Sequence, residues 1–189
     1  GLLDTQRDSL IVNGDFPHIV YDSFDVKNTI LNIDNRKGAQ LDYALNIKSF
    51  ESPSIQLYNS DVNGAAANNR LGVNVFLRDS KNNDKYMVGG NFTVRDKTYQ
   101  FSLDPDKLLL NYDKWTVAPD NLIQYGQEGV YVRNFEISNS GQMLSVISTS
   151  SQPNSPVKAT FTNFKLETLT RYADQDTAMI GGILNGNVT

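Results

Sequence analysis

The sequence predicts an all-β protein, built as an antiparallel β-sandwich with jelly-roll-like character. Two observations carry this prediction. Short segments alternate apolar and polar residues with the period of a strand. The links between them are rich in Asn, Asp, Gly and Ser, which favour turns. The expected strands include 41–47, 55–58, 71–78, 85–95, 98–103, 129–138, 142–149 and 158–169.

Three intervals describe the expected domain organisation. Residues 1–22 form an irregular N-terminal lead-in, because the apolar run at 10–12 is followed at once by the turn-forming sequence Asn-Gly-Asp. Residues 23–170 form the sandwich domain, and residues 171–189 form a C-terminal tail or linker. Within the sandwich, residues 61–70 are rich in Asn, Gly and Ala and are expected to form a loop.

One short internal helix is expected within the sandwich. Asp104 is a good N-cap, Pro105 suits the first helical position, and Asp106 favours the positive end of a helix. The apolar residues 108–110 would complete the helix. A second, weaker helical pattern extends over residues 172–180 of the tail.

Residues 111–128 lose the alternating pattern and are expected to form a long loop. Loops of this length are uncommon in compact domains and often functional. The loop carries Trp115 and Tyr125, and Tyr112 and Tyr131 lie near it in the sequence. Flat aromatic rings stack on sugars or anchor protein interfaces, so these four residues are the candidates for ligand or partner binding. The alternative is that Trp115 covers one end of the sandwich core.

Composition excludes several functional classes. The net charge is −4 with a pI of about 4.9, and no cluster of Lys and Arg is present to neutralise nucleic-acid phosphates. No apolar stretch is long enough to cross a bilayer, so no membrane partner is expected. The chain has no cysteine, which excludes a disulfide-stapled scaffold. Cytoplasmic, virion and cell-surface origins remain open.

The sequence offers no credible active site. His18 is the only histidine, and no nucleophile motif accompanies it. The carboxylate pairs Asp22/Asp25, Asp104/Asp106 and Asp174/Asp176 lie too close in sequence to face each other across a cleft. Residues 79–84 fit a hairpin turn better than a calcium loop, because Lys81 stands where a ligand is needed. No enzyme activity, metal or cofactor is predicted.

Taken in order, the segments between residues 38 and 180 resemble the N-terminal domain of the phage baseplate upper protein family of Gram-positive siphophages. The resemblance is carried by the strand segments 38–43, 73–79, 92–96, 99–103 and 129–135 and by the closing strand 161–169. It implies a structural virion component of the viral tail, which builds the host-facing baseplate and supports host attachment. It also implies partners among the tail proteins and homo-oligomers, commonly with threefold symmetry.

A second resemblance is to jelly-roll carbohydrate-binding modules. Residues 10–16 look like the opening strand of such modules and residues 161–167 look like the closing strand. This resemblance implies a secreted or Gram-positive surface protein that binds a glycan. The leading hypothesis is therefore a non-enzymatic assembly module of a phage or prophage tail baseplate, with carbohydrate binding as the alternative.

Overall fold

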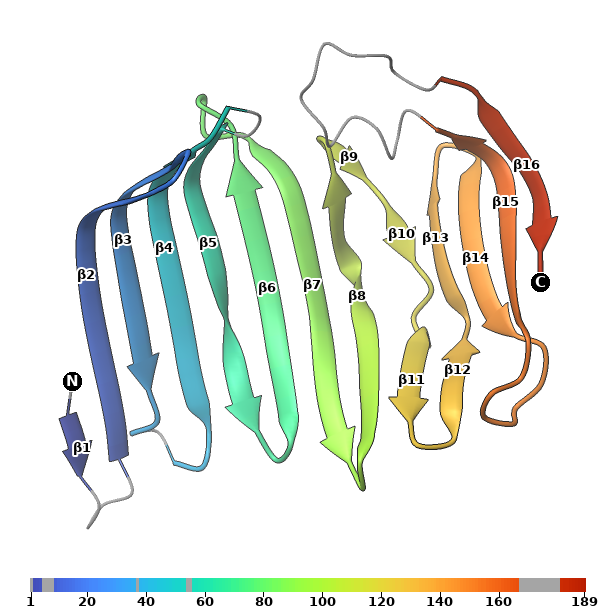
Figure 1. Ribbon diagram of the computed structural model, residues 1–189, viewed down its shortest axis with the longest axis horizontal. Coiled ribbons are helices and arrows are strands. Elements are labelled where there is room, and N and C mark those ends of the chain that lie inside the picture. The colour runs from blue at the N-terminus through green and yellow to red at the C-terminus, as the bar shows by residue number, and fades with distance from the viewer. Residues whose placement is uncertain (1, 5–8, 37, 54–55, 167–180) are drawn as a thin grey trace. The chain divides into compact units, whose positions relative to one another are not determined.

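The computed structural model describes residues 2–4, 9–36, 38–53, 56–166 and 181–189. The described residues form antiparallel strands and no helix, which confirms the all-β prediction (Figure 1). The chain divides into two compact units, residues 1–88 and residues 89–189. The boundary falls inside the interval 23–170, where a single domain was expected, and within strand β7 (Asp84–Arg95).

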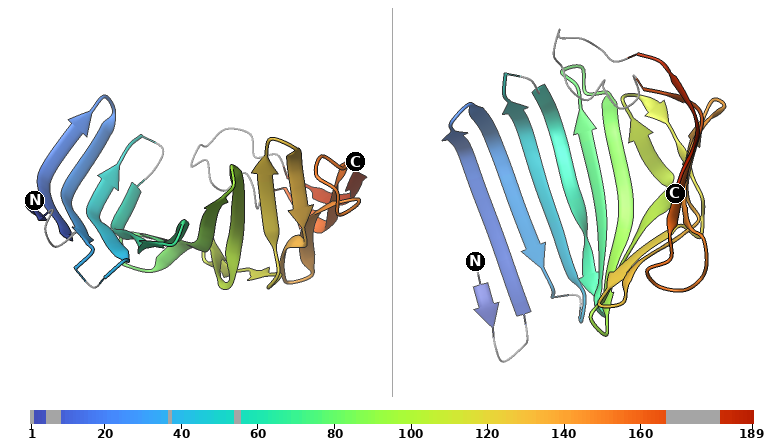
Figure 2. Two further views of the ribbon diagram at one scale, coloured as in Figure 1. Left: turned by 90° about the horizontal axis from the view of Figure 1, so that it is seen from below. Right: turned by 45° about the vertical axis from the view of Figure 1, so that its right-hand side comes forward.

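Unit 1 is a meander in which each strand pairs with its neighbours in sequence. The strands β2 to β6 lie in a single layer in the views of Figure 2. Before β7 the unit contains β1 (Leu2–Asp4), β2 (Ser9–Tyr21), β3 (Phe24–Asp34), β4 (Leu41–Glu51), β5 (Gln56–Ala67) and β6 (Arg70–Arg78).

Unit 2 contains strands from two sheets. The first sheet begins with the C-terminal part of β7 and has the order β7-β8-β11-β12, with β9 also paired to β8. The second sheet has the order β10-β13-β14-β15-β16. The strands are β8 (Thr98–Leu110), β9 (Asp113–Lys114), β10 (Thr116–Val117), β11 (Leu122–Gly126), β12 (Gly129–Arg133), β13 (Phe135–Asn139), β14 (Gln142–Ser148), β15 (Val157–Lys165) and β16 (Ile183–Val188).

Tight turns with positive φ angles connect several of the strands. Asn68 and Asn69 have φ angles of 50° and 60° between β5 and β6, and Asp96 and Lys97 have φ angles of 48° and 63° between β7 and β8. Two consecutive residues with positive φ match the right-handed twist of the flanking strands, and Asn and Asp tolerate this conformation. The abundance of these residue types therefore reflects hairpin chemistry.

The core of unit 2 lies between its two sheets. Trp115, Val117 and Phe164 are each 1% exposed, and the rings of Trp115 and Phe164 are 5.9 Å apart. The register of β15 shifts between Phe161 and Phe164, next to Asn163 with its φ of 46°. This bulge places both phenylalanines on one face, where their rings are 5.9 Å apart. Unit 2 is thus a two-layer, sandwich-like arrangement.

The short helix expected over residues 104–110 is wrong, because β8 continues through this interval to Leu110. The side chain of Asp104 accepts a hydrogen bond from Asn91 and does not cap a helix. The backbone of the final residues pairs with β9, where Leu109 lies opposite Lys114. Long-range backbone pairing therefore overrides the local capping signal. The weak helical pattern at 172–180 lies outside the described residues.

Four intervals expected to be irregular, looped or a tail contain strands. Residues 1–22 include β1 and the long strand β2, which continues through the expected turn at residues 13–15 because Gly14 pairs with Leu31. The expected loop at 111–128 contains β9, β10 and β11. Residues 61–70 are also mainly strand, since β5 continues to Ala67. The expected tail 171–189 contributes β16 at its described end.

We predict that Phe164→Ala lowers the free energy of unfolding of unit 2 by about 3–5 kcal/mol, because it removes a fully buried ring and leaves a cavity beside Trp115. The control is Tyr125→Ala, since this ring is 59% exposed and loses only its stacking on Tyr99. Its cost should be about 0.5–1.5 kcal/mol. Urea unfolding followed by tryptophan fluorescence measures both values, and equal losses would contradict the assigned core.

Candidate functional site

The strand register of unit 1 gathers apolar residues on one side of the sheet. In antiparallel strands, residues directly opposite each other lie on the same face. One row across β2 to β6 is Val12, Ile33, Tyr43, Gly64 and Val73, and the next row is Gly14, Leu31, Leu45, Val62 and Val75.

We call the surface formed by these two rows and their neighbours the apolar face. Ile47 lies on the same face, two residues beyond Leu45 on β4, and a shorter row contains Leu41, Ala66 and Leu71. We define the apolar face by Val12, Gly14, Leu31, Ile33, Leu41, Tyr43, Leu45, Ile47, Val62, Gly64, Ala66, Leu71, Val73 and Val75. The row through Ile47 on the same side also contains Phe16, Thr29 and Ser60, so polar residues border the face there.

The opposite side of the same sheet is polar along its centre. One row on that side is Asn13, Asn32, Ala44, Asn63 and Asn74. The amides of Asn74 and Asn63 are joined by a hydrogen bond of 3.3 Å between neighbouring strands. We call this side the polar face, and it makes the sheet of unit 1 amphipathic.

The apolar face has no covering layer among the described residues of unit 1. Its side chains are half-buried, and no apolar side chain in that part of the structure is fully buried. The fully buried apolar side chains of the described chain lie between residues 103 and 164, in unit 2. An extensive uncovered apolar surface on a folded protein marks a site of interaction.

The apolar face offers few free polar groups. The hydroxyl of Tyr43 donates a 3.0 Å hydrogen bond to the carbonyl oxygen of Gly72, and burial raises the pKa of this phenol, so it stays neutral. Gly64 lies beside this contact. A Cβ atom at Gly64 would stand 1.9 Å from the Gly72 carbonyl oxygen. Only glycine therefore fits at this point of the face.

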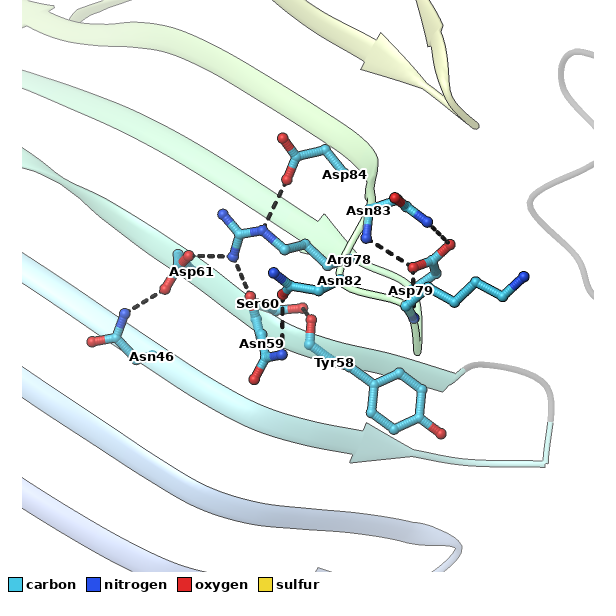
Figure 3. A network of polar contacts seen from close by, with 11 residues as sticks. Asn46, Tyr58, Asn59, Ser60, Asp61, Arg78, Asp79, Asn82, Asn83 and Asp84 are labelled. Atoms are coloured by element: carbon cyan, nitrogen blue, oxygen red, sulfur yellow. Dashed lines mark hydrogen bonds and ion pairs between the residues drawn. The ribbon is translucent and has the colours of Figure 1, made fainter.

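A network of charged side chains surrounds Arg78 in unit 1 (Figure 3). Its guanidinium donates hydrogen bonds to Asp61 at 2.5 Å and to Asp84 at 2.9 Å, and a further one to the carbonyl oxygen of Asn59. The hydrogen bond to Asp61 is the main cause that raises the pKa of Arg78. The same Asp61 accepts a hydrogen bond from the side chain of Asn46.

The position of this network indicates a structural function. The register between β5 and β6 shifts between Tyr58 and Asp61, and Asn59 has a φ of 43° at this point. Arg78 holds the irregular backbone by its bond to the Asn59 carbonyl. Within the described ranges, no group of three or more His, Cys, Asp or Glu side chains is arranged to hold a metal ion.

The structure separates the four aromatic residues predicted as binding candidates. Trp115 is 1% exposed in the core of unit 2, so its indole has no surface to offer a ligand. Tyr112 is 49% exposed at the turn after β8, whereas Tyr125 on β11 pairs with Tyr99 near the start of β8. Tyr131 is half-buried on β12, opposite Gln124.

Three exposed aromatic rings form a stacked row that the sequence did not predict, although Tyr125 was named as a candidate. Phe92 stacks on Tyr99 with ring centroids 5.9 Å apart, and Tyr99 stacks on Tyr125 at 6.5 Å. The strict alternation of residues 98–103 placed Tyr99 on a strand face. It could not show that Phe92 and Tyr125 occupy the two neighbouring strands.

The single histidine contacts a carboxylate on the surface. His18 Nε2 lies 2.8 Å from Asp25 Oδ1, and Lys27 Nζ lies 3.2 Å from Asp25 Oδ2. Desolvation acts to raise the pKa of Asp25, but the hydrogen bonds from Lys27 and His18 outweigh it and hold the pKa below its ordinary value. These side chains are largely exposed, so the contact is a surface feature.

Searches against protein-family models, curated proteins and solved structures find no match to this chain. In the ranges covered by the structure, no helix is long and apolar enough to span a membrane.

We predict that Arg78→Met lowers the free energy of unfolding of unit 1 by about 1.5–3 kcal/mol, because it leaves the partly buried Asp61 without its cationic partner. In an Asp61→Asn background the same change should cost less, since the ion pair is already broken. The control is Arg36→Met, whose side chain is 61% exposed and whose pair with Asp34 should contribute below about 1 kcal/mol. Urea denaturation of the unchanged protein, of each single variant and of the double variant measures these free energies. If the losses of the two single variants simply add in the double variant, the ion pair between Arg78 and Asp61 is refuted.

Proposed function

We propose that this chain is a non-catalytic binding module, and that its apolar face holds the hydrocarbon part of a lipid-like ligand. The observation that carries the proposal is the pair of uninterrupted apolar rows across β2 to β6, without a second layer over them in the described residues of unit 1.

The dimensions of the apolar face suit an acyl chain. Neighbouring strands lie about 4.8 Å apart, so the rows from β2 to β6 extend for about 19 Å. One leaflet of the hydrocarbon core of a bilayer is about 15 Å thick, which is the span of an extended acyl chain. Such a chain could therefore lie along a row, and each methylene removed from water would contribute about 0.8 kcal/mol.

The chemistry of the face favours hydrocarbon over a folded protein partner. Protein interfaces are enriched in Arg, Trp and Tyr and form about one hydrogen bond per 100–200 Å². The two central rows contain no charged residue, and their only hydroxyl, that of Tyr43, already bonds Gly72. A surface of Val, Leu, Ile and Gly satisfies a ligand that makes no hydrogen bonds.

The amphipathic sheet explains how such a module can stay folded without a second layer. The polar face, with Asn13, Asn32, Asn63 and Asn74 in one row, remains solvated. A bound hydrocarbon would then take the place of the second sheet that covers a sandwich core.

A second candidate is the assembly function implied by the resemblance to phage baseplate proteins. The observation that favours it is the same uncovered apolar face, because a layer from another tail protein could also cover it. The carbohydrate-binding alternative relied on Trp115, and the burial of this side chain between the sheets of unit 2 removes its main support.

We predict that the purified protein binds cis-parinaric acid with saturable fluorescence, and that Leu31→Glu weakens this binding at least tenfold, because it places a carboxylate in a central row of the apolar face. The matched control is Asn32→Glu, which adds the same charge at the next residue of β3, on the polar face. It should bind as the unchanged protein does.

Circular dichroism establishes that both variants remain folded, and sedimentation reports any bound protein. Absence of saturable binding, or an equal loss in the two variants, would reject the hydrocarbon proposal. Loss of a protein complex in Leu31→Glu alone, without fatty-acid binding, would support assembly in its place.

A further inference from the structure

Strand β16 is the open edge of the second sheet of unit 2. It pairs with β15 on one side and ends the strand order, so no described strand pairs with its other side. Its apolar side chains are exposed: Ile183 by 64%, Leu184 by 37% and Val188 by 67%. An edge of this kind presents backbone donors and acceptors to any further strand.

β16 lacks the features that usually protect an edge. Natural edge strands carry lysine, proline or inward-pointing charges, or they are very short. The sequence of β16 is Ile-Leu-Asn-Gly-Asn-Val over six residues, without charge or proline. At the other edge of the same sheet, β10 has only two residues. The unprotected edge is therefore confined to β16.

The register with β15 identifies the face on which the exposed side chains lie. Val188 is opposite Ala159, Gly186 is opposite Phe161, and Leu184 is opposite Phe164. Phe164 is 1% exposed against Trp115, so this is the face that packs into the sandwich. Leu184 and Val188 extend the apolar layer to the edge of the sheet, where it stops uncovered.

We propose that β16 of one copy pairs antiparallel with β16 of a second copy, with the twofold axis at Gly186. An axis perpendicular to the sheet keeps each face on its own side, so only residues of the same face can meet. With the axis at Gly186, Leu184 lies opposite the partner's Val188, and Val188 lies opposite the partner's Leu184.

This register is self-complementary. The apolar side chains meet on the interior face, and Asn185 lies opposite the partner's Asn187 on the other face. The Oδ1 of Asn185 already accepts a 2.7 Å hydrogen bond from the backbone N–H of Asn163, so its NH2 group is the donor toward the partner's Asn187. Gly186 has no side chain to clash at the axis, and its φ of 141° suits glycine. With the axis at Asn185, Leu184 would instead face a glycine, and the apolar pairing would be lost.

The pairing requires concentrations high enough to offset its small interface. Each cross-strand apolar pair contributes about 0.2–1 kcal/mol, in addition to the backbone ladder. A single pair of edges buries much less area than the interface of a stable dimer. The dimer should therefore dissociate on dilution. The proposal does not rest on hydrocarbon binding, since it is argued from β16 in unit 2 and the apolar face lies in unit 1.

Sedimentation velocity across a range of protein concentrations tests the proposal. The unchanged protein should pass from monomer to dimer as concentration rises. Leu184→Lys and Val188→Lys should remain monomeric where the unchanged protein is half dimeric, because each places a charge in the paired edge. The control is Ile147→Lys on the inner strand β14, where the side chain is 39% exposed, and it should dimerise normally.

Cross-linking tests the register, since the natural chain has no cysteine. An equimolar mixture of Leu184→Cys and Val188→Cys proteins should form a disulfide-linked dimer under mild oxidation. Either variant alone should not, because its two thiols would be displaced by about four residues, or ~13 Å, beyond the reach of a disulfide. Circular dichroism checks the fold of each variant. A monomer at every concentration, or equal cross-linking in the mixed and single samples, would overturn the proposal.

Discussion

The period-two alternation of side chains is the constraint on which the structure of unit 1 depends. A slip of one residue between any two strands would move every apolar side chain of one strand to the polar face. From β2 to β5 the pairing keeps one register, so Val12, Ile33, Tyr43 and Gly64 fall in one row. The amphipathic character of the sheet thus depends on the pairing between strands as well as on the alternation within each strand.

Where the register does change, side chains hold the backbone in place. Between β5 and β6 the irregular backbone at Asn59 is bonded by Arg78, whose charge is balanced by Asp61 and Asp84. In β15 the corresponding irregularity brings Phe161 and Phe164 onto the same face. The first irregularity lies beside a network of charged side chains, whereas the second lets two aromatic rings join the apolar core. The consequence of each irregularity therefore depends on the polarity of the residues around it.

The sequence predicted strands best where one face is purely apolar. Residues 41–47 and 98–103 alternate strictly, and both lie in strands. The prediction failed where local signals compete with long-range pairing. Asp104 and Pro105 favour the start of a helix, but the amide of Asn121 accepts from the backbone N–H of Leu103 and donates to its carbonyl oxygen, which holds this part of β8 beside the segment before β11. No local pattern reveals such a partner.

The candidate site shows the same dependence on pairing. Val12, Leu45 and Val75 can each be recognised as strand residues, but nothing in the sequence states that β2, β4 and β6 lie in one sheet on a common face. Trp115 was the most conspicuous side chain in the sequence, and its burial against Phe164 makes it part of the core. In an antiparallel protein of this kind, the proposed binding surface follows from the register of ordinary Val, Leu and Ile residues. Conspicuous aromatic residues are a weaker guide, because the second sheet decides whether they reach the surface.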